Sequence, residues 1–162
     1  MDEVKGVDGK YYTSNHATIW RWREAYQHDF AARLDWSHQP KFKGANHHPL
    51  VDVNGDRSRN TIFLTAAPGA PVTLDASATS DPDGDEFSFH WYPYREAGSF
   101  PLTIHYRNLK WQGDKTAVLK LNAPATNAPA TIHFILEVRD RGQPSLTSYR
   151  RVILKVDPTG QD

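Results

Sequence analysis

The chain has 162 residues, with 19 Lys and Arg against 19 Asp and Glu, and a formal net charge of zero. That length suits one domain with an appendage, and the balanced charge argues against a nucleic-acid-binding protein, which usually carries a basic excess on one face. The sequence has no cysteine, which excludes a disulfide framework, a thiolate metal site and a cysteine nucleophile. No apolar run approaches the roughly 20 residues that span a bilayer, and residues 1–5 lack the basic and apolar regions of a signal peptide.

An aromatic-rich segment comes first along the chain. Its large apolar side chains recur at a spacing of four, at Trp22, Tyr26, Phe30 and Leu34. This spacing predicts a helix over about residues 23–34 with one apolar stripe. We expect Trp20, Trp22 and Trp36 to pack on another surface, which is either the following domain of the chain or a neighbouring domain.

Residues 40–60 predict an irregular linker, because Pro40 and the Asn54-Gly55 pair favour turns. Within it, Asn46 and His47 are interpreted as a polar anchor that fixes the linker to the following domain. A zinc site at His47 and His48 is the alternative. Neighbours in an extended segment point to opposite faces, so such a site would need further ligands from elsewhere.

From residue 61 the sequence changes to short segments in which apolar and polar residues alternate, as in half-buried strands. Seven such segments are predicted, at residues 61–64, 72–76, 87–91, 102–106, 117–121, 132–138 and 152–156. Their number and spacing predict an all-β fold, an immunoglobulin-like antiparallel β-sandwich over residues 61–157. Residues 1–60 then form an N-terminal linker with a short helix, and residues 158–162 form a tail. Trp91, Phe134 and Leu154 are expected in the core.

Acidic residues cluster between the second and third predicted strands. Asp81, Asp83 and Asp85 alternate in the segment Ser80-Asp81-Pro82-Asp83-Gly84-Asp85, and we expect Asp140 beside them. Because Ca²⁺ favours several oxygen ligands, these four residues are the candidate calcium site and Ca²⁺ is the candidate cofactor. The alternative is a metal-free turn in which the Asp side chains accept hydrogen bonds from nearby backbone amides.

Three aromatic residues are candidates for binding carbohydrate. Tyr92 and Tyr94 lie outside the alternation of apolar residues in their strand, and Trp111 lies in a polar stretch where burial is not forced. Exposed rings of this kind can stack on the CH groups of a pyranose. The alternative is that these rings cover edges of the sandwich, with their polar groups in water.

Catalytic patterns are weak in this sequence. Glycoside hydrolysis needs two carboxylates across a cleft, and nothing in the sequence places any two of Glu96, Glu137 and Asp140 in that way. Neither a nucleophile elbow nor a phosphate-binding glycine loop is present. The sequence therefore predicts a binding or positioning module and not an enzyme.

Several motifs point to known families. The run Asp75-Ala76-Ser77, the acidic loop and Trp91 resemble the PKD-type immunoglobulin-like modules of bacterial exported enzymes. A closer resemblance covers about residues 10–157 and rests on these motifs in order: Thr18-Ile19-Trp20-Arg21-Trp22-Arg23, Asp29-Phe30-Ala31-Ala32-Arg33-Leu34-Asp35-Trp36, Ala45-Asn46-His47-His48-Pro49, Tyr94, Glu96-Ala97-Gly98 and Tyr149-Arg150-Arg151-Val152. On these motifs the chain resembles the C-terminal domain of a bacterial cellulose-binding protein family whose full-length members carry an N-terminal nucleoside-hydrolase-like domain.

This resemblance implies a non-catalytic, carbohydrate-associated module of a secreted or periplasmic protein, with cellulose or a related glucan as its ligand. The candidate residues for binding it are Trp111, Tyr92 and Tyr94. The resemblance leaves open an alternative, a structural or interaction module. In that version Trp20, Trp22 and Trp36 dock on the nucleoside-hydrolase-like domain. Any hydrolase activity would belong to that domain, because the N-terminal aspartate cluster of nucleoside hydrolases has no counterpart in this chain.

Overall fold

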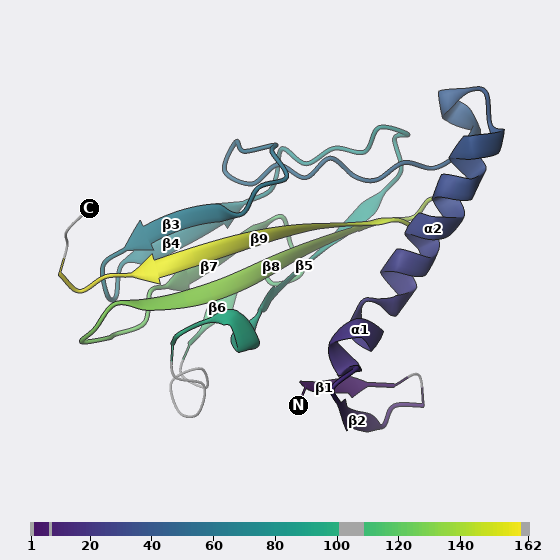
Figure 1. The fold of residues 1–162 in the computed structure, drawn as a ribbon. Coiled ribbons are helices and arrows are strands. Elements are labelled where there is room, and N and C mark those ends of the chain that lie inside the picture. Colours follow the sequence, from purple (N-terminus) through teal and green to yellow (C-terminus); the bar gives the residue numbers. More distant parts are fainter. Residues whose placement is uncertain (1, 7, 101–108, 160–162) are drawn as a thin grey trace.

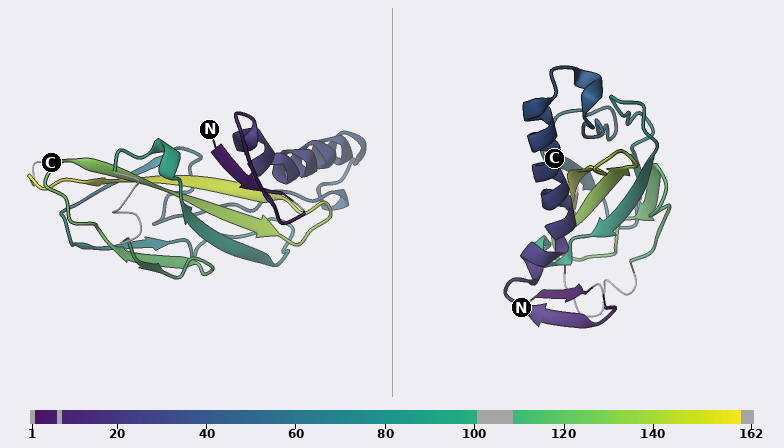
Figure 2. Two further views of the ribbon diagram at one scale, coloured as in Figure 1. Left: turned by 90° about the horizontal axis from the view of Figure 1, so that it is seen from below. Right: turned by 90° about the vertical axis from the view of Figure 1, so that its right-hand side faces the viewer.

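The computed structural model describes residues 2–6, 8–100 and 109–159 and shows a β-sandwich with helices along one side (Figures 1 and 2). The elements in chain order are β1 (Asp2–Lys5), β2 (Tyr11–Ser14), α1 (Ala17–Arg21), α2 (Arg23–His38), η1 (Phe42–Gly44), β3 (Ile62–Ala66), β4 (Pro71–Asp75), β5 (Phe87–Pro93), η2 (Arg95–Ala97), β6 (Trp111–Gln112), β7 (Val118–Asn122), β8 (Ala130–Asp140) and β9 (Thr147–Val156).

Two sheets form the sandwich, one with the strand order β3-β9-β8-β5 and one with the order β4-β7-β6. Neighbouring strands are antiparallel except β3 and β9, which run parallel. A separate hairpin, β1-β2, lies beside α1. The prediction of an all-β, immunoglobulin-like sandwich is therefore confirmed.

Alternating side chains of the strands build the core between the two sheets. On β8 the apolar residues Ile132, Phe134, Leu136 and Val138 are buried, as their period of two predicts. Trp91 on β5 is only 1% exposed, and its indole Nε1 donates a hydrogen bond of 3.1 Å to the backbone oxygen of Thr116. The buried indole thus keeps a partner for its one polar group, as a large buried aromatic side chain requires.

Most predicted elements lie close to their expected bounds. The predicted helix begins at Arg23 as expected and continues to His38. Six of the seven predicted segments overlap observed strands, and the seventh, residues 102–106, lies outside the described residues. The sequence did not predict β1, β2 or the two-residue strand β6. Short polar strands of this kind lack the alternation that identifies a strand.

The helices α1 and α2, called here the helical arm, pack on the outer face of the four-stranded sheet near the start of β9 (Figure 2). Trp22 lies at the junction of the two helices and meets the Tyr149 ring edge to face, with 5.0 Å between the ring centroids. The rest of the predicted stripe does not face the sandwich, because Tyr26, Phe30 and Leu34 are exposed. No helix in the described part of the chain is long and apolar enough to cross a membrane.

The expected polar anchor of the linker is confirmed at Asn46, which is buried. Its side-chain amide donates hydrogen bonds to Oδ2 of Asp140 at 3.1 Å and to the backbone oxygen of Pro144 at 2.8 Å. A Cβ on Gly142 would lie 2.1 Å from Nδ2 of Asn46, so only glycine fits beside the anchor. The linker is thereby joined to the turn between β8 and β9.

Candidate functional site

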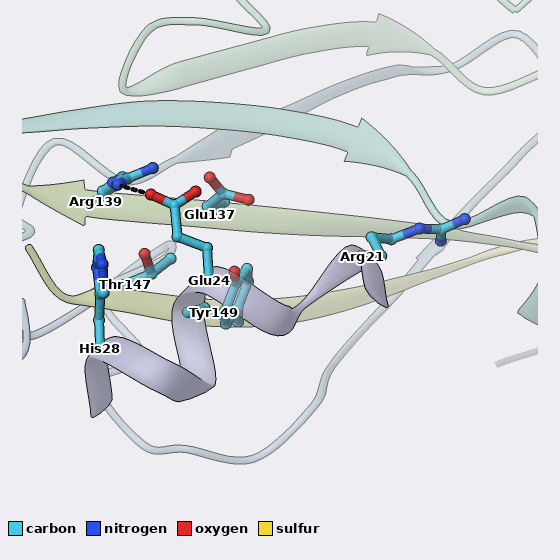
Figure 3. Close-up of a pocket in the computed structure, with 8 residues that line it drawn as sticks. Arg21, Glu24, His28, Glu137, Arg139, Thr147 and Tyr149 are labelled. Carbon is cyan, nitrogen blue, oxygen red and sulfur yellow. Dashed lines mark hydrogen bonds and ion pairs between the residues drawn. The ribbon is translucent and has the colours of Figure 1, made fainter. Parts of the chain in front are cut away.

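Two hollows are candidates for a functional site, and the smaller one lies between α2 and the outer face of the sheet (Figure 3). Its volume is about 80 Å³. Side chains of the arm and of strands β8 and β9 line it: Arg21, Glu24, Ala25, His28, Glu137, Arg139, Thr147 and Tyr149. Ligand pockets usually enclose about 300–1,000 Å³, so this cavity is too small for a sugar.

The small cavity instead contains the polar contacts that hold the arm. Figure 3 shows Glu24 reaching from α2 to Arg139 on β8, with which it forms an ion pair. His28 of the same helix lies 2.8 Å, through Nδ1, from the backbone oxygen of Ser145. Burial raises the pKa of the Glu137 carboxyl next to this pair, and burial also raises the pKa of the Tyr149 phenol. These shifts follow from covering polar groups with a helix and do not require a catalytic role.

A wider groove of about 550 Å³ follows the three-stranded sheet β4-β7-β6. Its described lining residues come from all three strands and from the segments beside β6 and β7: Pro71, Val72, Thr73, Leu109, Lys110, Trp111, Gln112, Lys120, Leu121, Asn122 and Ala123. This volume lies in the range of small-ligand sites.

Cross-strand pairing gives the groove its polar groups. Lys120 on β7 is the register partner of both Thr73 on β4 and Gln112 on β6, and all three are exposed. Because residues in register on neighbouring strands share a face of the sheet, these side chains form one row of a hydroxyl, an ammonium and an amide group. The row offers hydrogen-bond donors and acceptors to a ligand that lies across the strands.

Trp111, the first predicted sugar-binding residue, lines this groove. Its ring is half-buried and meets the Phe134 ring edge to face, with 6.1 Å between the centroids. The contact with the core fixes the indole in place at the edge of the sandwich.

The two predicted tyrosines lie away from this groove, Tyr92 on the four-stranded sheet and Tyr94 directly after its strand β5. Tyr92 on β5 is half-buried beneath the arm, with its ring centroid 6.4 Å from that of Trp22. Tyr94 follows β5, and the guanidinium carbon of Arg151 lies 6.0 Å from its ring centroid. The structure therefore brings Tyr92 and Tyr94 near each other but does not place either on one platform with Trp111.

The acidic loop is held by hydrogen bonds within the protein. Oδ1 of Asp81 accepts bonds from the backbone amides of Asp83 and Asp85, at 2.9 and 3.1 Å. The carboxylate of Asp83 accepts a bond of 2.7 Å from the backbone amide of His47 and lies 3.1 Å from Nδ1 of that side chain. These contacts match the self-capped turn that was the alternative to a calcium site.

Asp140 completes the predicted metal set and is also occupied. Its Oδ1 accepts hydrogen bonds from the backbone amides of Gly142 and Leu146, at 3.0 and 2.8 Å. Burial, followed by the charges of Asp81 and Asp140, raises the pKa of Asp85, so the loop carboxylates do interact. Among the described residues, no group of three or more His, Asp or Glu side chains is arranged to hold a metal ion. Calcium binding by Asp81, Asp83, Asp85 and Asp140 stays a prediction.

The three tryptophans predicted for docking have different surroundings. Trp22 contacts Tyr149, and Trp36 donates a hydrogen bond of 2.7 Å from Nε1 to the backbone oxygen of Asn46. Trp36 also stacks on the His47 ring at 5.5 Å between centroids. Trp20, by contrast, is 42% exposed. Two of the three thus serve the chain's own packing, and Trp20 alone among them projects into solvent.

Sequence reasoning missed the polar row of the groove. The signal for it is the register between β6 and β7, and β6 has only two residues. Such a pairing leaves no periodic pattern, so Thr73, Gln112 and Lys120 look like ordinary surface residues in the sequence.

Comparisons with known proteins place these features in a family. Residues 71–156 match the family model for the C-terminal domain of cellulose-binding protein Sde0182. No curated protein matches the chain. Among solved structures, the PKD domain of the KIAA 1837 protein is similar at 20% identity and a TM-score of 0.42, over 70% of this chain and 91% of that one.

A second solved structure shares much more with the chain. It is a nucleoside hydrolase-related hypothetical protein from Saccharophagus degradans that is associated with carbohydrate metabolism, with 35% identity and a TM-score of 0.81. The similarity covers 96% of this chain and 40% of that protein, so this chain spans less than half of that relative's length. By the family match over more than half of its residues, the chain belongs to the family of the cellulose-binding protein Sde0182 C-terminal domain.

Proposed function

We propose that this chain is a non-catalytic module that binds cellulose or a related glucan in the groove of the β4-β7-β6 sheet. The observation that carries the proposal is the lining of that groove, which combines the Trp111 ring with the polar side chains of Thr73, Lys120 and Gln112. All the described lining residues fall inside the range 71–156 that matches the cellulose-binding family.

The chemistry of the lining suits a glucan. A glucan chain presents hydroxyl groups at the edges of its rings and CH groups on their faces. The amides of Gln112 and Asn122 and the Thr73 hydroxyl can donate and accept hydrogen bonds with those hydroxyl groups. An indole contributes a large apolar surface at little cost in side-chain entropy, and packing on Phe134 holds the Trp111 ring before any ligand arrives.

The same lining supports binding without hydrolysis. Glycosidases place two carboxyl groups about 5–9.5 Å apart on either side of the scissile bond. None of the described residues that line the groove is Asp, Glu or His, so these residues supply neither a carboxyl general acid nor a carboxylate nucleophile. Glu24 and Glu137 do lie near each other, but the cavity they line holds about 80 Å³ and is occupied by the arm's own contacts.

The family resemblance supports a secreted or periplasmic protein, in which such a module would hold a linked domain close to a polysaccharide. Localisation of the natural protein by fractionation of the producing cells tests this part of the proposal. Recovery from the cytoplasm would contradict it.

A cellulose pull-down tests glucan binding. The wild-type chain is expected to sediment with microcrystalline cellulose, and Trp111→Ala and Gln112→Ala are expected to weaken that retention. Gln112→Ala is included because its side chain is exposed and the substitution spares the core. The matched control is Trp20→Ala, which removes an exposed tryptophan from the arm and should leave retention unchanged.

Each outcome of the pull-down has a defined meaning. No retention of the wild-type chain on cellulose, or on a soluble β-glucan in an affinity gel, would remove the proposal. If Trp20→Ala abolishes retention on cellulose and Gln112→Ala does not, the binding site lies on the arm and not in the groove.

A further inference from the structure

The helical arm exposes five large apolar side chains, called here the outer helix face. It comprises Ile19, Trp20, Tyr26, Phe30 and Leu34, whose side chains are between 42% and 64% exposed. With about 3.6 residues per turn, Tyr26, Phe30 and Leu34 lie one turn apart along the same side of α2. Soluble proteins seldom expose adjoining apolar side chains of this size unless the surface has a partner.

The sandwich does not compete for this face, because the opposite side of the helix makes the contacts with it. Ala25, His28 and Ala32 lie on that opposite side, and Ala32 is fully buried. Figure 2 shows the arm along one side of the sandwich, with the sheet on one side of α2 only. The fold of this chain therefore does not depend on contacts made by the outer helix face.

The charges around the face are mostly basic. Arg23 and Arg33 lie on the same side of α2 as Tyr26 and Phe30, by the helical repeat. Arg33 is held by Asp29 of the preceding turn, with 2.8 Å between Nε and Oδ2. A partner that covers the face would therefore be apolar at its centre and would carry carboxylates at its rim.

The Saccharophagus relative indicates what such a partner could be. The similarity covers 96% of this chain, which includes the 16-residue helix α2, but only 40% of that relative. The other part of the relative has no counterpart in these 162 residues, and the matched family is described as a C-terminal domain. A domain that precedes this chain would join it at the hairpin β1-β2, which lies against α1 at one end of the face (Figure 1).

We infer that the outer helix face is the docking surface for a preceding domain of the nucleoside hydrolase-related kind, which buries Trp20, Tyr26, Phe30 and Leu34. Docking through a short covalent connection needs little intrinsic affinity, since the effective concentration of the tethered domain is high. The arm then fixes the orientation of the sandwich, and with it the groove, relative to that domain. The inference stands independently of glucan binding, because the arm and the groove lie on different sheets.

Side-chain footprinting with hydroxyl radicals tests the inference on two forms of the protein. One is this 162-residue chain, and the other is the longer polypeptide in which the natural preceding sequence is retained. Labelling of Trp20, Tyr26, Phe30 and Leu34 is expected to be lost in the longer form. Phe63 on β3 is the internal control, because it is 73% exposed and lies outside the arm, and it should be labelled equally in both forms.

The substitution Phe30→Asp gives a second readout. It is expected to leave the melting temperature of the 162-residue chain unchanged, because Phe30 is exposed there. In the longer form it should restore labelling of Tyr26 and Leu34, while Phe63→Asp should not.

Two results would overturn the inference. One is equal labelling of the outer helix face in the two forms. The other is protection in the 162-residue chain alone that grows with concentration and accompanies dimers in sedimentation, which would make a second copy the occupant.

Discussion

The sandwich and the helical arm are held by different kinds of contact. The sandwich has a core of buried apolar side chains around Trp91 and Phe134, drawn from both sheets. The arm is attached mainly through polar contacts, such as the ion pair of Glu24 with Arg139 and the bond of His28 to the Ser145 backbone. Trp22 adds an aromatic contact at the junction of the helices.

This difference separates the apolar side chains that stabilise the fold from those that remain available for contacts with other molecules. Burial of apolar area is the main favourable term in folding, and the sandwich uses its apolar residues for that purpose. The arm keeps much of its apolar surface outside and depends on directional contacts, each worth only about 0.5–1.5 kcal/mol. We therefore expect the sandwich to keep its structure when the arm opens, but not the reverse.

The largest effect is expected from Trp91→Ala, which tests the role of the core. Trp91 is 1% exposed, and large-to-small changes of this kind cost about 3–5 kcal/mol. Urea denaturation should show a lower midpoint for the sandwich and the arm together. Phe63→Ala, at an exposed position, is the control and should change little. An arm signal that persists after the sandwich has unfolded would contradict this dependence of the arm on the sandwich.

The next effect is expected from Asn46→Ala, which removes the anchor of the linker. Asp140 and the backbone oxygen of Pro144 would each lose a buried hydrogen-bond donor, at a cost of about 1–3 kcal/mol. Amide hydrogen exchange should become faster in α2 and stay slow in β8. Asn127→Ala, in an exposed loop, should leave both rates unchanged. Equal acceleration in α2 and β8 would contradict a separable arm.

The sequence predicted those parts of the molecule that follow a periodic pattern. The period of two in β8 and the Trp91 position identified the core, and the spacing of four identified α2. The same spacing did not reveal which side of the helix would face the sandwich. Ala32 and His28 allow a close approach to the sheet, whereas the larger Phe30 is left outside. That choice depends on the shape of a distant sheet, and no local pattern encodes it.

The sequence predicted only part of the candidate site, because the rest of the site depends on contacts between distant segments. Trp111 could be named because tryptophan in a polar stretch is unusual, and it lines the wide groove. The sequence could not show whether Tyr92 is exposed or covered by the arm. The residue that covers it, Trp22, lies seventy residues earlier in the chain. The polar row of Thr73, Lys120 and Gln112 depends on the register of β6 with β7, which only the folded structure fixes.

A smaller effect is expected from Glu137→Gln, which probes the interface between the arm and the sheet. Burial raises the folded-state pKa of Glu137 above its unfolded value of about 4.3. Between these two values the folded state holds more protons, so the free energy of unfolding falls as pH rises through the interval. The variant should therefore melt higher than wild type at pH 7–8, by about 2 °C, and no higher below pH 4.

The control for this pH dependence is Glu86→Gln, since Glu86 is 79% exposed and pairs with Arg141 away from the arm. Other ionisable groups face Glu137 from the helices and the neighbouring strands, namely Arg21, Glu24, His28, His90, Tyr92, Arg139 and Tyr149. These groups are present in both wild type and variant, so the difference between the two proteins reports on the charge of Glu137. A difference that grows toward low pH would contradict a buried carboxyl at this position.

The smallest effect is expected from Ca²⁺, and it bears on both regions at once. The carboxylates of Asp83 and Asp140 accept hydrogen bonds from His47 and Asn46 of the linker. Calcium would compete with these hydrogen bonds, which fix the linker that follows the arm. The predicted calcium site implies that millimolar Ca²⁺ raises the melting temperature by mass action, as any ligand of the folded state does. The rise should be small, because the displaced contacts offset part of the gain. An unchanged melting temperature, or a rise that a chelator does not reverse, would contradict the predicted site. Faster hydrogen exchange in α2 under the same conditions would then show that the metal and the arm compete for one set of carboxylates.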